Sequence, residues 1–352
     1  MPAFIDSKSP DHPLARAEAG DRSNAISEPT QALANCMNVG LINNMPDSAL
    51  ISTERQLFDL INASAGRMPV RLRLYTLPMI PRNDWGRQYM GRHYFELEDL
   101  WGKDLDGIIV TGTEPHAQHL AEEPYWSALG EVIDWAKDHT ISSAWSCLAV
   151  HGAVLYLDGI DRHPLGSKCI GIFEHKKVLD HPLMQDAPAQ LRIPHSRWNE
   201  ISDAALAPNG YNVLTRSSDA GVDMFVKQQK NSLFVYFQGH PEYDTHSLLG
   251  EYRRDVGRFL RREIEFYPTM PKGYFDHHGE QLLTVFQKQA LLDRRGELLA
   301  SFPTESVAAN LKNSWHAAGK CIYRNWIQYI SDRKRRRCKS TVSSVTDSRA
   351  YC

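Results

Sequence analysis

The sequence predicts an α/β protein in three layers, with a mostly parallel β-sheet flanked by helices and with β-hairpin insertions. In the first half of the chain, short apolar runs alternate with segments in which apolar residues recur at helical spacing. Such alternation is typical of a parallel sheet with helices on both faces. After Pro164 the pattern changes to short β-like segments in hairpin succession, which indicates inserted antiparallel strands.

The first half supplies the parallel strands. An apolar strand at 39–42 is followed by a predicted helix whose apolar residues run from Leu50 to Ile61, after the candidate caps Asp47 and Ser48. Further strands are expected at 70–77, 107–110 and 141–145. Helices are expected at 126–136, where apolar residues line one face, and at 148–157.

The second half contains β-like segments at 171–178, 211–215, 222–226 and 233–237, then helices at 245–261 and 314–330. The chain therefore divides into four parts. We expect a disordered N-terminal arm over 1–35, which is polar and broken by prolines. A main domain over 36–262 and a helical extension over 263–331 that packs on it are followed by a basic disordered tail over 332–352.

The net charge is −2 for 352 residues, so the molecule as a whole has no electrostatic reason to bind nucleic acid or a membrane. No apolar run reaches the roughly 18 residues that span a bilayer. The basic run at 333–337 is compatible with contact to RNA or acidic lipid and with a solvated tail. The absence of interleaved aromatic residues favours the solvated tail.

The N-terminus lacks the pattern of a secretory signal, and the six cysteines show no CxxC spacing. We therefore expect a reducing, cytoplasmic location, where a thiol can be chemically active. No metal site is expected, since the pair His277–His278 has no matching ligands nearby and is interpreted as surface.

Cys147 lies between a predicted strand and a predicted helix. Such a turn exposes a side chain at the carboxyl edge of the sheet, where open α/β folds bind ligands. The helix N-terminus favours a thiolate, and its backbone N–H groups can hold an oxyanion. By position alone, an ordinary buried cysteine is the alternative.

His240 and Glu242 follow the end of the strand at 233–237. A histidine can take the proton of a thiol, and a carboxylate two residues later can hold the imidazole tautomer. The pairing of this element with a cysteine at the end of another strand predicts that Cys147, His240 and Glu242 form a catalytic constellation.

Ordered motifs in this chain resemble the homoserine O-succinyltransferase/O-acetyltransferase family of methionine biosynthesis, which has the class I glutamine amidotransferase-like fold. The resemblance covers residues 38–262 and returns at 314–330. Its carriers are NMP at 44–46, TERQ at 53–56, GIIVTG at 107–112, YW at 125–126, Cys147, Lys168 with GIFEH at 171–175, PHSR at 194–197, GHPEYD at 239–244 and EYRRDV at 251–256.

The resemblance implies ping-pong transfer of an acyl group from acyl-CoA, a co-substrate, to the hydroxyl of homoserine through a Cys147 thioester. No cofactor is implied, and a homodimer is expected. The family motifs mark Lys168, Ser196, Arg197 and Arg254 as substrate-binding positions. An arginine can pair bidentately with the amino-acid carboxylate; by spacing alone, these residues are compatible with surface charges and a turn serine.

The sequence also departs from the family pattern. The position that selects the acyl donor, glycine for succinyl or glutamate for acetyl, carries His116. An imidazole would not repel a succinyl carboxylate as a glutamate would, which favours succinyl-CoA. The segment after Pro46 lacks the usual lysines, His151 adds a titratable group near the nucleophile, and 263–313 has no clear counterpart.

Three alternatives remain open at this point. The acceptor is homoserine or, in a divergent member, serine or another hydroxy-amino acid. A glutamine amidotransferase or cysteine hydrolase would use the same residue types, although the residues after Cys147 and the lack of a synthetase domain oppose it. An idle regulatory protein on this fold is opposed by the presence of all three catalytic residue types.

Overall fold

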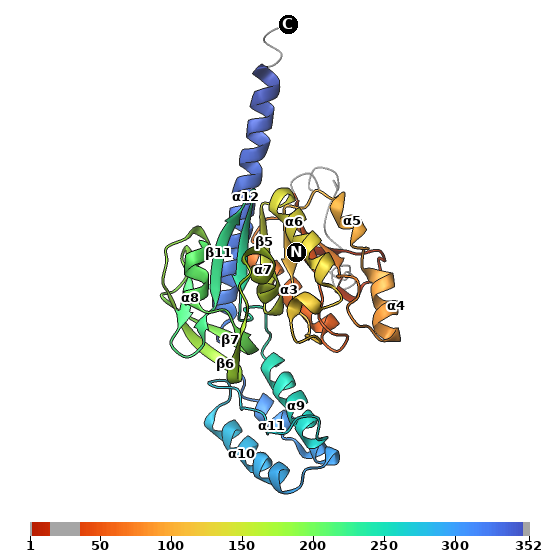
Figure 1. Ribbon diagram of the computed structural model, residues 1–352, viewed down its shortest axis with the longest axis vertical. Helices are drawn as coiled ribbons and strands as arrows, with labels where there is room; N and C mark the ends of the chain where they lie inside the picture. Colours follow the sequence, from red (N-terminus) through yellow and green to blue (C-terminus); the bar gives the residue numbers. More distant parts are fainter. Residues whose placement is uncertain (1, 15–35, 348–352) are drawn as a thin grey trace.

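The computed structural model describes residues 2–14 and 36–347, with side chains up to residue 337. Its centre is an eight-stranded sheet with the order β1-β3-β2-β4-β5-β12-β11-β8 (Figure 1). All neighbours from β1 to β12 pair in parallel, and β11 pairs antiparallel with β12 and β8. The predicted mostly parallel sheet is confirmed. The strands are β1 (Ala3–Asp6), β2 (Met37–Ile42), β3 (Val70–Tyr75), β4 (Gly107–Val110), β5 (Ser142–Ser146), β8 (Asn212–Val213), β11 (Met224–Gln229) and β12 (Ser232–Phe237).

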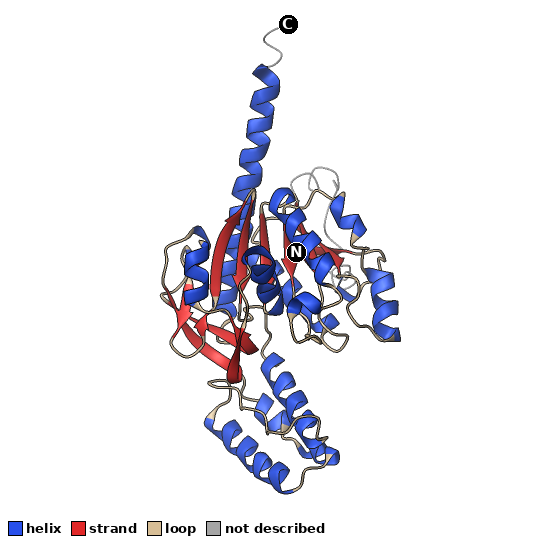
Figure 2. Cartoon of the chain, in the orientation of Figure 1, coloured by secondary structure: helices blue, strands red, loops and turns tan. Residues whose placement is uncertain are grey.

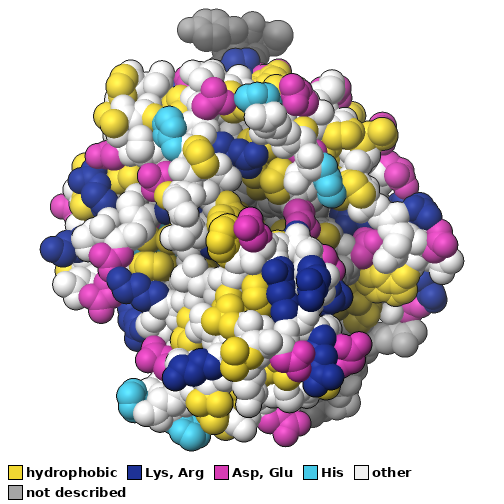
Figure 3. Space-filling model, turned by 60° about the horizontal axis from the view of Figure 1, so that its bottom comes forward, with side chains coloured by type: hydrophobic (Ala, Val, Ile, Leu, Met, Phe, Trp, Pro, Cys, Tyr) yellow, Lys and Arg dark blue, Asp and Glu magenta, His cyan; other side chains and the backbone are white. Residues whose placement is uncertain are grey.

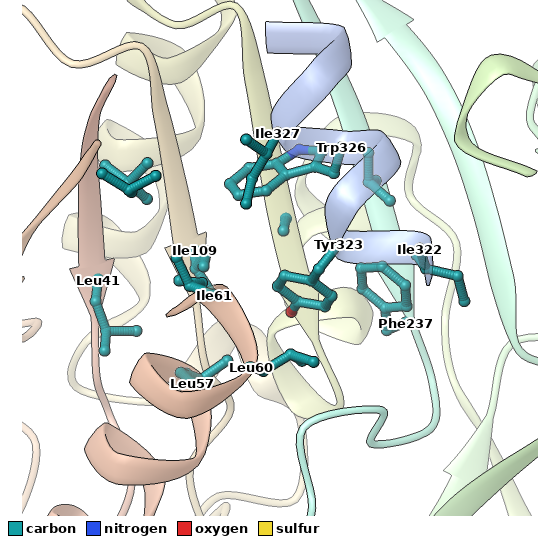
Figure 4. Close-up of a cluster of buried hydrophobic side chains, with 14 of the residues drawn as sticks. Leu41, Leu57, Leu60, Ile61, Ile109, Phe237, Ile322, Tyr323, Trp326 and Ile327 are labelled. Atoms are coloured by element: carbon teal, nitrogen blue, oxygen red, sulfur yellow. The ribbon is translucent and has the colours of Figure 1, made fainter. Parts of the chain in front are cut away.

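Helices cover both faces of this sheet, so the three-layer prediction is also confirmed. On one face lie α3 (Leu50–Ser64) and α12 (His316–Asp347), which contact each other and the central strands. On the other face lie α6 (Trp126–His139) and α7 (Leu148–Asp158). Because β4 is buried on both sides, its sequence GIIV is a continuous apolar run. β5 is buried as well, and the buried hydroxyl groups of Ser142 and Ser143 form hydrogen bonds with the Leu233 carbonyl and the Trp145 indole. The α3–α12 layer is drawn in Figure 4, with Leu57, Leu60, Ile61, Ile322, Tyr323, Trp326 and Ile327 over Leu41, Ile109 and Phe237.

The hairpin insertion forms a second, antiparallel sheet with the order β10-β9-β6-β7. It stands beside the main sheet in Figure 2. Its strands are β6 (His163–Lys177), β7 (Gln190–Glu200), β9 (Thr215–Ser217) and β10 (Gly221–Val222). The remaining short helices of the α/β body are α4 (Asp84–His93), α5 (Glu98–Trp101), α8 (Asp203–Leu206), η1 (Leu120–Glu122), η2 (Pro182–Met184) and η3 (Ala207–Asn209).

A helical unit projects from the carboxyl side of the sheet (Figure 1). It contains α9 (Ser247–Leu260), α10 (His277–Leu292), η4 (Gly296–Ser301) and α11 (Thr304–Ala308). Its core joins Tyr252 and Phe259 of α9 with Phe286, Phe302 and Trp315. We expected an extension that begins at residue 263, but the apolar face of α9 packs in this unit, so α9 belongs with it.

The expected disorder at both ends needs correction. Residues 3–6 form β1, in which Ala3 and Ile5 are buried against the body and the backbone pairs with β3; residues 15–35 lie outside the described part. At the other end, α12 continues without a break to Asp347. The basic run extends this helix because Lys and Arg have good helix propensity, and Lys334 forms an ion pair with Asp106 at 2.7 Å. Residues 348–352 are not described.

The expected capping of α3 is wrong as well. The residue before its first turn is Ala49, and no side chain caps the helix. Asp47 instead accepts hydrogen bonds from the Asn83 backbone N–H at 2.7 Å and from Arg82 at 3.2 Å, so it fixes the start of α4. Among the residues that the structure describes, no helix combines the length and apolar character of a membrane span.

Candidate active site

Cys147 occupies the turn between β5 and α7 with φ 53° and ψ −116°. Only glycine adopts such a conformation readily, and strain of this kind in other residues clusters at functional sites. The thiol is half-buried. Gly112 makes the tight turn possible, since a Cβ there would lie 2.8 Å from the Leu148 nitrogen. The predicted strand–turn–helix setting of Cys147 is therefore present, with Thr111 and Gly112 beside the start of α7.

His240 follows β12, the parallel neighbour of β5. Its Nδ1 lies 2.8 Å from Glu242 Oε1, and its ring stacks on Tyr243 at 4.2 Å between centroids. Burial alone would lower the pKa of His240. The charges of Glu242 and Cys147, with hydrogen bonds to both side chains, nevertheless raise that pKa well above 6.5. The structure thus brings the three predicted catalytic residues together at the ends of the neighbouring strands β5 and β12.

The loop that carries His240 and Glu242 rests on α12. Trp315, just before that helix, donates a hydrogen bond from Nε1 to the Tyr243 carbonyl at 2.8 Å. Gly319 lets the helix approach closely, because a Cβ there would lie 2.7 Å from the Pro241 carbonyl oxygen. The terminal helix and the residue just before it therefore support the loop of His240 and Glu242.

Three of the predicted substrate-binding residues gather around two carboxylates of α9. Lys168 Nζ lies 2.7 Å from Asp255 and 3.5 Å from Glu251. Ser196 donates a short hydrogen bond to Glu251, and Arg254 lies 3.0 Å from Asp255. Burial opposes the charge of Glu251, but Lys168 and the hydrogen bonds of Ser196 and Tyr243 hold the pKa of that carboxyl below its ordinary value.

Sequence reasoning missed the functional place of Glu251 and Asp255, although both lie in the EYRRDV motif. The signal that marks them is their spacing, because residues four apart share one face of a helix. The cluster combines two cations, Lys168 and Arg254, with these two carboxylates. Its Arg254 side chain is 52% exposed, so the guanidinium can reach a substrate.

The structure does not bring Arg197 into this cluster. Its guanidinium donates to the backbone carbonyls of Asn199 at 2.8 Å and Ala220 at 2.5 Å. Arg197 is buried, and it follows Ser196 on strand β7, where consecutive side chains point to opposite faces. Arg197 therefore joins segments of the second sheet and lies outside the cluster around α9, while its substrate contact stays a prediction.

His116 lies exposed on the loop after Gly112. This loop is fixed by Glu123, a buried residue that the sequence did not single out. Its Oε1 accepts hydrogen bonds from the backbone N–H groups of His116 at 2.7 Å and Ala117 at 2.8 Å. The loop borders an apolar pocket next to the Cys147 turn, lined among others by Leu120, Tyr125, Trp126, Leu148 and Ala149.

His151, which we expected to add a titratable group near the site, is a neutral core residue. It is buried, and its Nε2 lies 3.4 Å from Gln238 Oε1. Burial lowers the pKa of His151 to about 3, against the opposing effect of that hydrogen bond. The ring therefore carries no charge in the physiological range.

One group in the described part has metal-ligand geometry. Ligand atoms of His175, His195 and Asp223, all buried, lie within 4.8 Å of one another. However, Arg197 Nε donates to His195 Nδ1 at 3.3 Å. The neutral His195 ring then carries its proton on Nε2, the atom that faces Asp223 at 3.8 Å. A protonated nitrogen offers no lone pair to a cation, so this donor set fits a metal poorly.

The chain is similar to known proteins over most of its length. The family described as homoserine O-succinyltransferase matches residues 5–336 of this chain. A homoserine O-succinyltransferase of Rhodopseudomonas palustris is 41% identical over 327 residues, 93% of this chain and 98% of the relative. One from Methylorubrum extorquens is 44% identical over 84% of this chain and 88% of the relative. A solved glutamine amidotransferase of Thermotoga maritima shares 15% identity over 84% of this chain and 98% of its own, with a TM-score of 0.47.

The matched residues include the mostly parallel sheet, the antiparallel sheet and the helical unit, and they contain the predicted catalytic and substrate-binding residues. The similarity thus extends over most of both chains. The resemblance predicted from the motifs is confirmed: the chain belongs to the homoserine O-succinyltransferase family.

Proposed function

We propose that this protein transfers an acyl group, preferentially succinyl, from acyl-CoA to the hydroxyl of homoserine in L-methionine biosynthesis, through a thioester on Cys147. The observation that carries the proposal is the strained Cys147 turn beside an imidazole bonded to Glu242 at 2.8 Å. An imidazolium next to a sulfur stabilises its thiolate form, which is the nucleophile.

In the first half-reaction, the Cys147 sulfur attacks the thioester carbonyl carbon. The Leu148 N–H, at the first position of α7, is placed to donate to the oxyanion. The bond from the carbonyl carbon to the CoA sulfur then breaks, and the leaving thiolate takes the proton of His240. In the second half-reaction, His240 removes the proton of the acceptor hydroxyl, the oxygen attacks the acyl carbon, and the Cys147 thiolate leaves. Glu242 holds the imidazole tautomer in both steps.

The acceptor site is the cluster around α9. The ammonium group of an amino acid suits the Glu251 and Asp255 carboxylates, and its carboxylate suits Arg254. Support for homoserine as the acceptor comes from the relatives named for that activity. Support for succinyl as the donor comes from the same names and from His116, which carries no negative charge where a glutamate would repel a second carboxylate.

The test is mass spectrometry of the full chain with succinyl-CoA and no acceptor. We expect the mass to rise by one succinyl group on the Cys147 peptide, and homoserine to remove it as O-succinylhomoserine. The Cys147→Ala variant is the control and should carry no adduct. Thiol release that is no faster with homoserine, serine or threonine than with water would instead identify a hydrolase.

A further inference from the structure

Tyr243 touches both halves of the candidate site at once. Its ring stacks on the imidazole of His240, with 4.2 Å between the ring centroids and 15° between the planes. Its hydroxyl donates a hydrogen bond to Oε1 of Glu251 at 2.5 Å. His240 belongs to the catalytic constellation and Glu251 to the cluster around α9, so Tyr243 joins the group that moves protons to a group that faces the acceptor.

The stack opposes a motion that the other contacts of His240 permit. The hydrogen bond between Nδ1 and Glu242, at 2.8 Å, fixes one atom of the ring, and the backbone N–H of His240 donates to the Pro194 carbonyl at 2.8 Å. With one hydrogen bond to the ring, the imidazole can still tilt about that contact. The face of Tyr243 resists the tilt, because stacked rings lose contact area when one of them turns. The stack therefore orients Nε2, the ring nitrogen that Glu242 leaves free for proton transfer.

Tyr243 is itself held at its backbone as well as at its hydroxyl. Its carbonyl accepts a hydrogen bond from Trp315 Nε1 at 2.8 Å, and its N–H donates to the His240 carbonyl at 3.2 Å. The ring also packs against the apolar core of the helical unit. A side chain fixed at both ends is a rigid link, so a displacement of Glu251 reaches the His240 ring.

Glu251 lies on α9, at the end of the molecule that comes forward in Figure 3. This end is hollowed near its centre, and charged side chains of both signs lie around the hollow. Glu251 Oε1 accepts from Tyr243, whereas Oε2 accepts a short hydrogen bond from Ser196 and lies 3.5 Å from Lys168 Nζ. Hydrogen bonds to an ionised carboxylate are strong and directional. Loss of the Tyr243 hydroxyl would leave Oε1 without this donor and would let the carboxylate turn.

We propose that Tyr243 is a positioning residue that couples acceptor binding at Glu251 to the orientation of His240. The inference rests on the proposed acyl transfer and adds a residue that acts through two others. The ring serves both half-reactions, because His240 works in each of them. The hydroxyl serves only the second, in which the acceptor ammonium lies at Glu251 and the acceptor hydroxyl must meet His240. A misplacement of about 1 Å at that point can cost about 100-fold in rate.

The two half-reactions are measured separately. Release of CoA thiol from succinyl-CoA without an acceptor, followed after rapid mixing, reports formation of the acyl-enzyme. Transfer is measured on the isolated acyl-enzyme as a rate against homoserine concentration, and hydrolysis is measured on the same species in water alone. Water needs His240 as a base but has no ammonium group for Glu251, so hydrolysis is the internal control for the chemistry at Cys147.

Tyr243→Phe keeps the stack and removes the hydroxyl. We expect this variant to lower transfer to homoserine about 30-fold and to keep thiol release and hydrolysis within about 3-fold of the unmodified protein. Tyr243→Leu removes the stack as well, and we expect thiol release to fall about 30-fold. The matched control is Tyr156→Phe, because Tyr156 is an exposed residue of α7 whose hydroxyl donates to Asp134 at 2.6 Å. It should leave all three rates unchanged.

An equal fall of all three rates in Tyr243→Phe would overturn the inference in favour of a general structural role, and unchanged transfer to homoserine would overturn it as well. Unchanged thiol release in Tyr243→Leu would overturn the role of the ring. Tyr243→Phe carries the test if Tyr243→Leu does not fold. Failure of the unmodified protein to form the acyl-enzyme, or to pass its acyl group to homoserine, would overturn the proposed function itself and the inference with it.

Discussion

The backbone N–H of Cys147 donates a hydrogen bond to the Phe237 carbonyl, 2.9 Å away. Phe237 is the last residue of β12, and His240 follows three residues later. The turn that presents the thiol is thereby tied to the strand that delivers the imidazole. The distance between Cys147 and His240 therefore depends on backbone geometry as well as on the two side chains. The backbone bond keeps both residues in position when the substrate is absent.

Strain at Cys147 predicts an unusual order of stability among its variants. Cys147→Gly relieves the positive φ, whereas Cys147→Ala retains it. We expect the glycine variant to be more stable than the alanine variant by about 1 kcal/mol, although both lose acyl transfer. Thermal unfolding monitored by circular dichroism measures the difference. Equal melting temperatures would show that the turn stores no strain.

The second prediction concerns pH. Because the pKa of His240 is raised above 6.5, its imidazolium stabilises the fold below the unfolded pKa of about 6.5, and this contribution is lost as pH rises through the folded pKa. Glu242→Gln removes the charge that raises this pKa. We expect the His240 ring to deprotonate at lower pH in NMR titrations, and kcat/KM to fall about 100-fold.

The stability difference between the unmodified protein and Glu242→Gln should be largest in acid and should shrink as pH rises. Denaturant unfolding across the pH range measures it. A difference that does not vary with pH would mean that Glu242 contributes through packing alone.

Gly112 provides a third test. In Gly112→Ala the new Cβ would lie 2.8 Å from the Leu148 nitrogen and 2.9 Å from the Leu148 Cβ, so the turn that carries Cys147 must shift. We expect a stability loss of about 1–3 kcal/mol and a loss of activity of at least about 10-fold. The matched control is Gly102→Ala, where no heavy atom lies within 4 Å. If Gly112→Ala and Gly102→Ala change stability and activity equally, the close approach of Gly112 to Leu148 is not required for activity.

The fourth prediction concerns α12. Trp326 is buried, and its Nε1 donates to Ser142 Oγ at 2.8 Å. Trp326→Ala should lower the free energy of unfolding by about 3–5 kcal/mol, and Trp326→Phe by less. Gln328→Ala, on the exposed side of the helix, should change it by less than about 0.5 kcal/mol. Chemical denaturation of the three variants measures these free energies of unfolding. A small loss in Trp326→Ala would mean that α12 is only appended to the core.

The sequence predicted the elements whose signal is local. Strands β4 and β12 are apolar runs that can be recognised without their partners, and the residue after β5 was identified as the nucleophile candidate from its neighbours alone. Strand β1 has only four residues, and its order comes from pairing with β3, nearly seventy residues further along the chain. No short sequence window contains that information.

The candidate site shows the same difference between features with a local sequence signal and features that depend on distant residues. The motifs contained Lys168, Ser196 and Arg254, but the carboxylates that organise them on α9 became apparent only when the helix was placed against β6 and β7. Arg197 is separated from the cluster because it lies on the face of the strand opposite its motif neighbour Ser196.

The position of α12 has a consequence for biosynthesis. This helix is translated after every strand of both sheets, yet Trp315 and Gly319 place it against the loop of His240 and Glu242. A nascent chain that has emerged only as far as α11 therefore already contains Cys147, His240 and Glu242, but it lacks the helix that supports the His240 loop. We expect ribosome-bound chains stalled before residue 315 to be sensitive to protease and unable to form the acyl adduct, so that reactivity is acquired only late in synthesis. Stalled chains that resist protease as well as the released protein does would contradict this order of events.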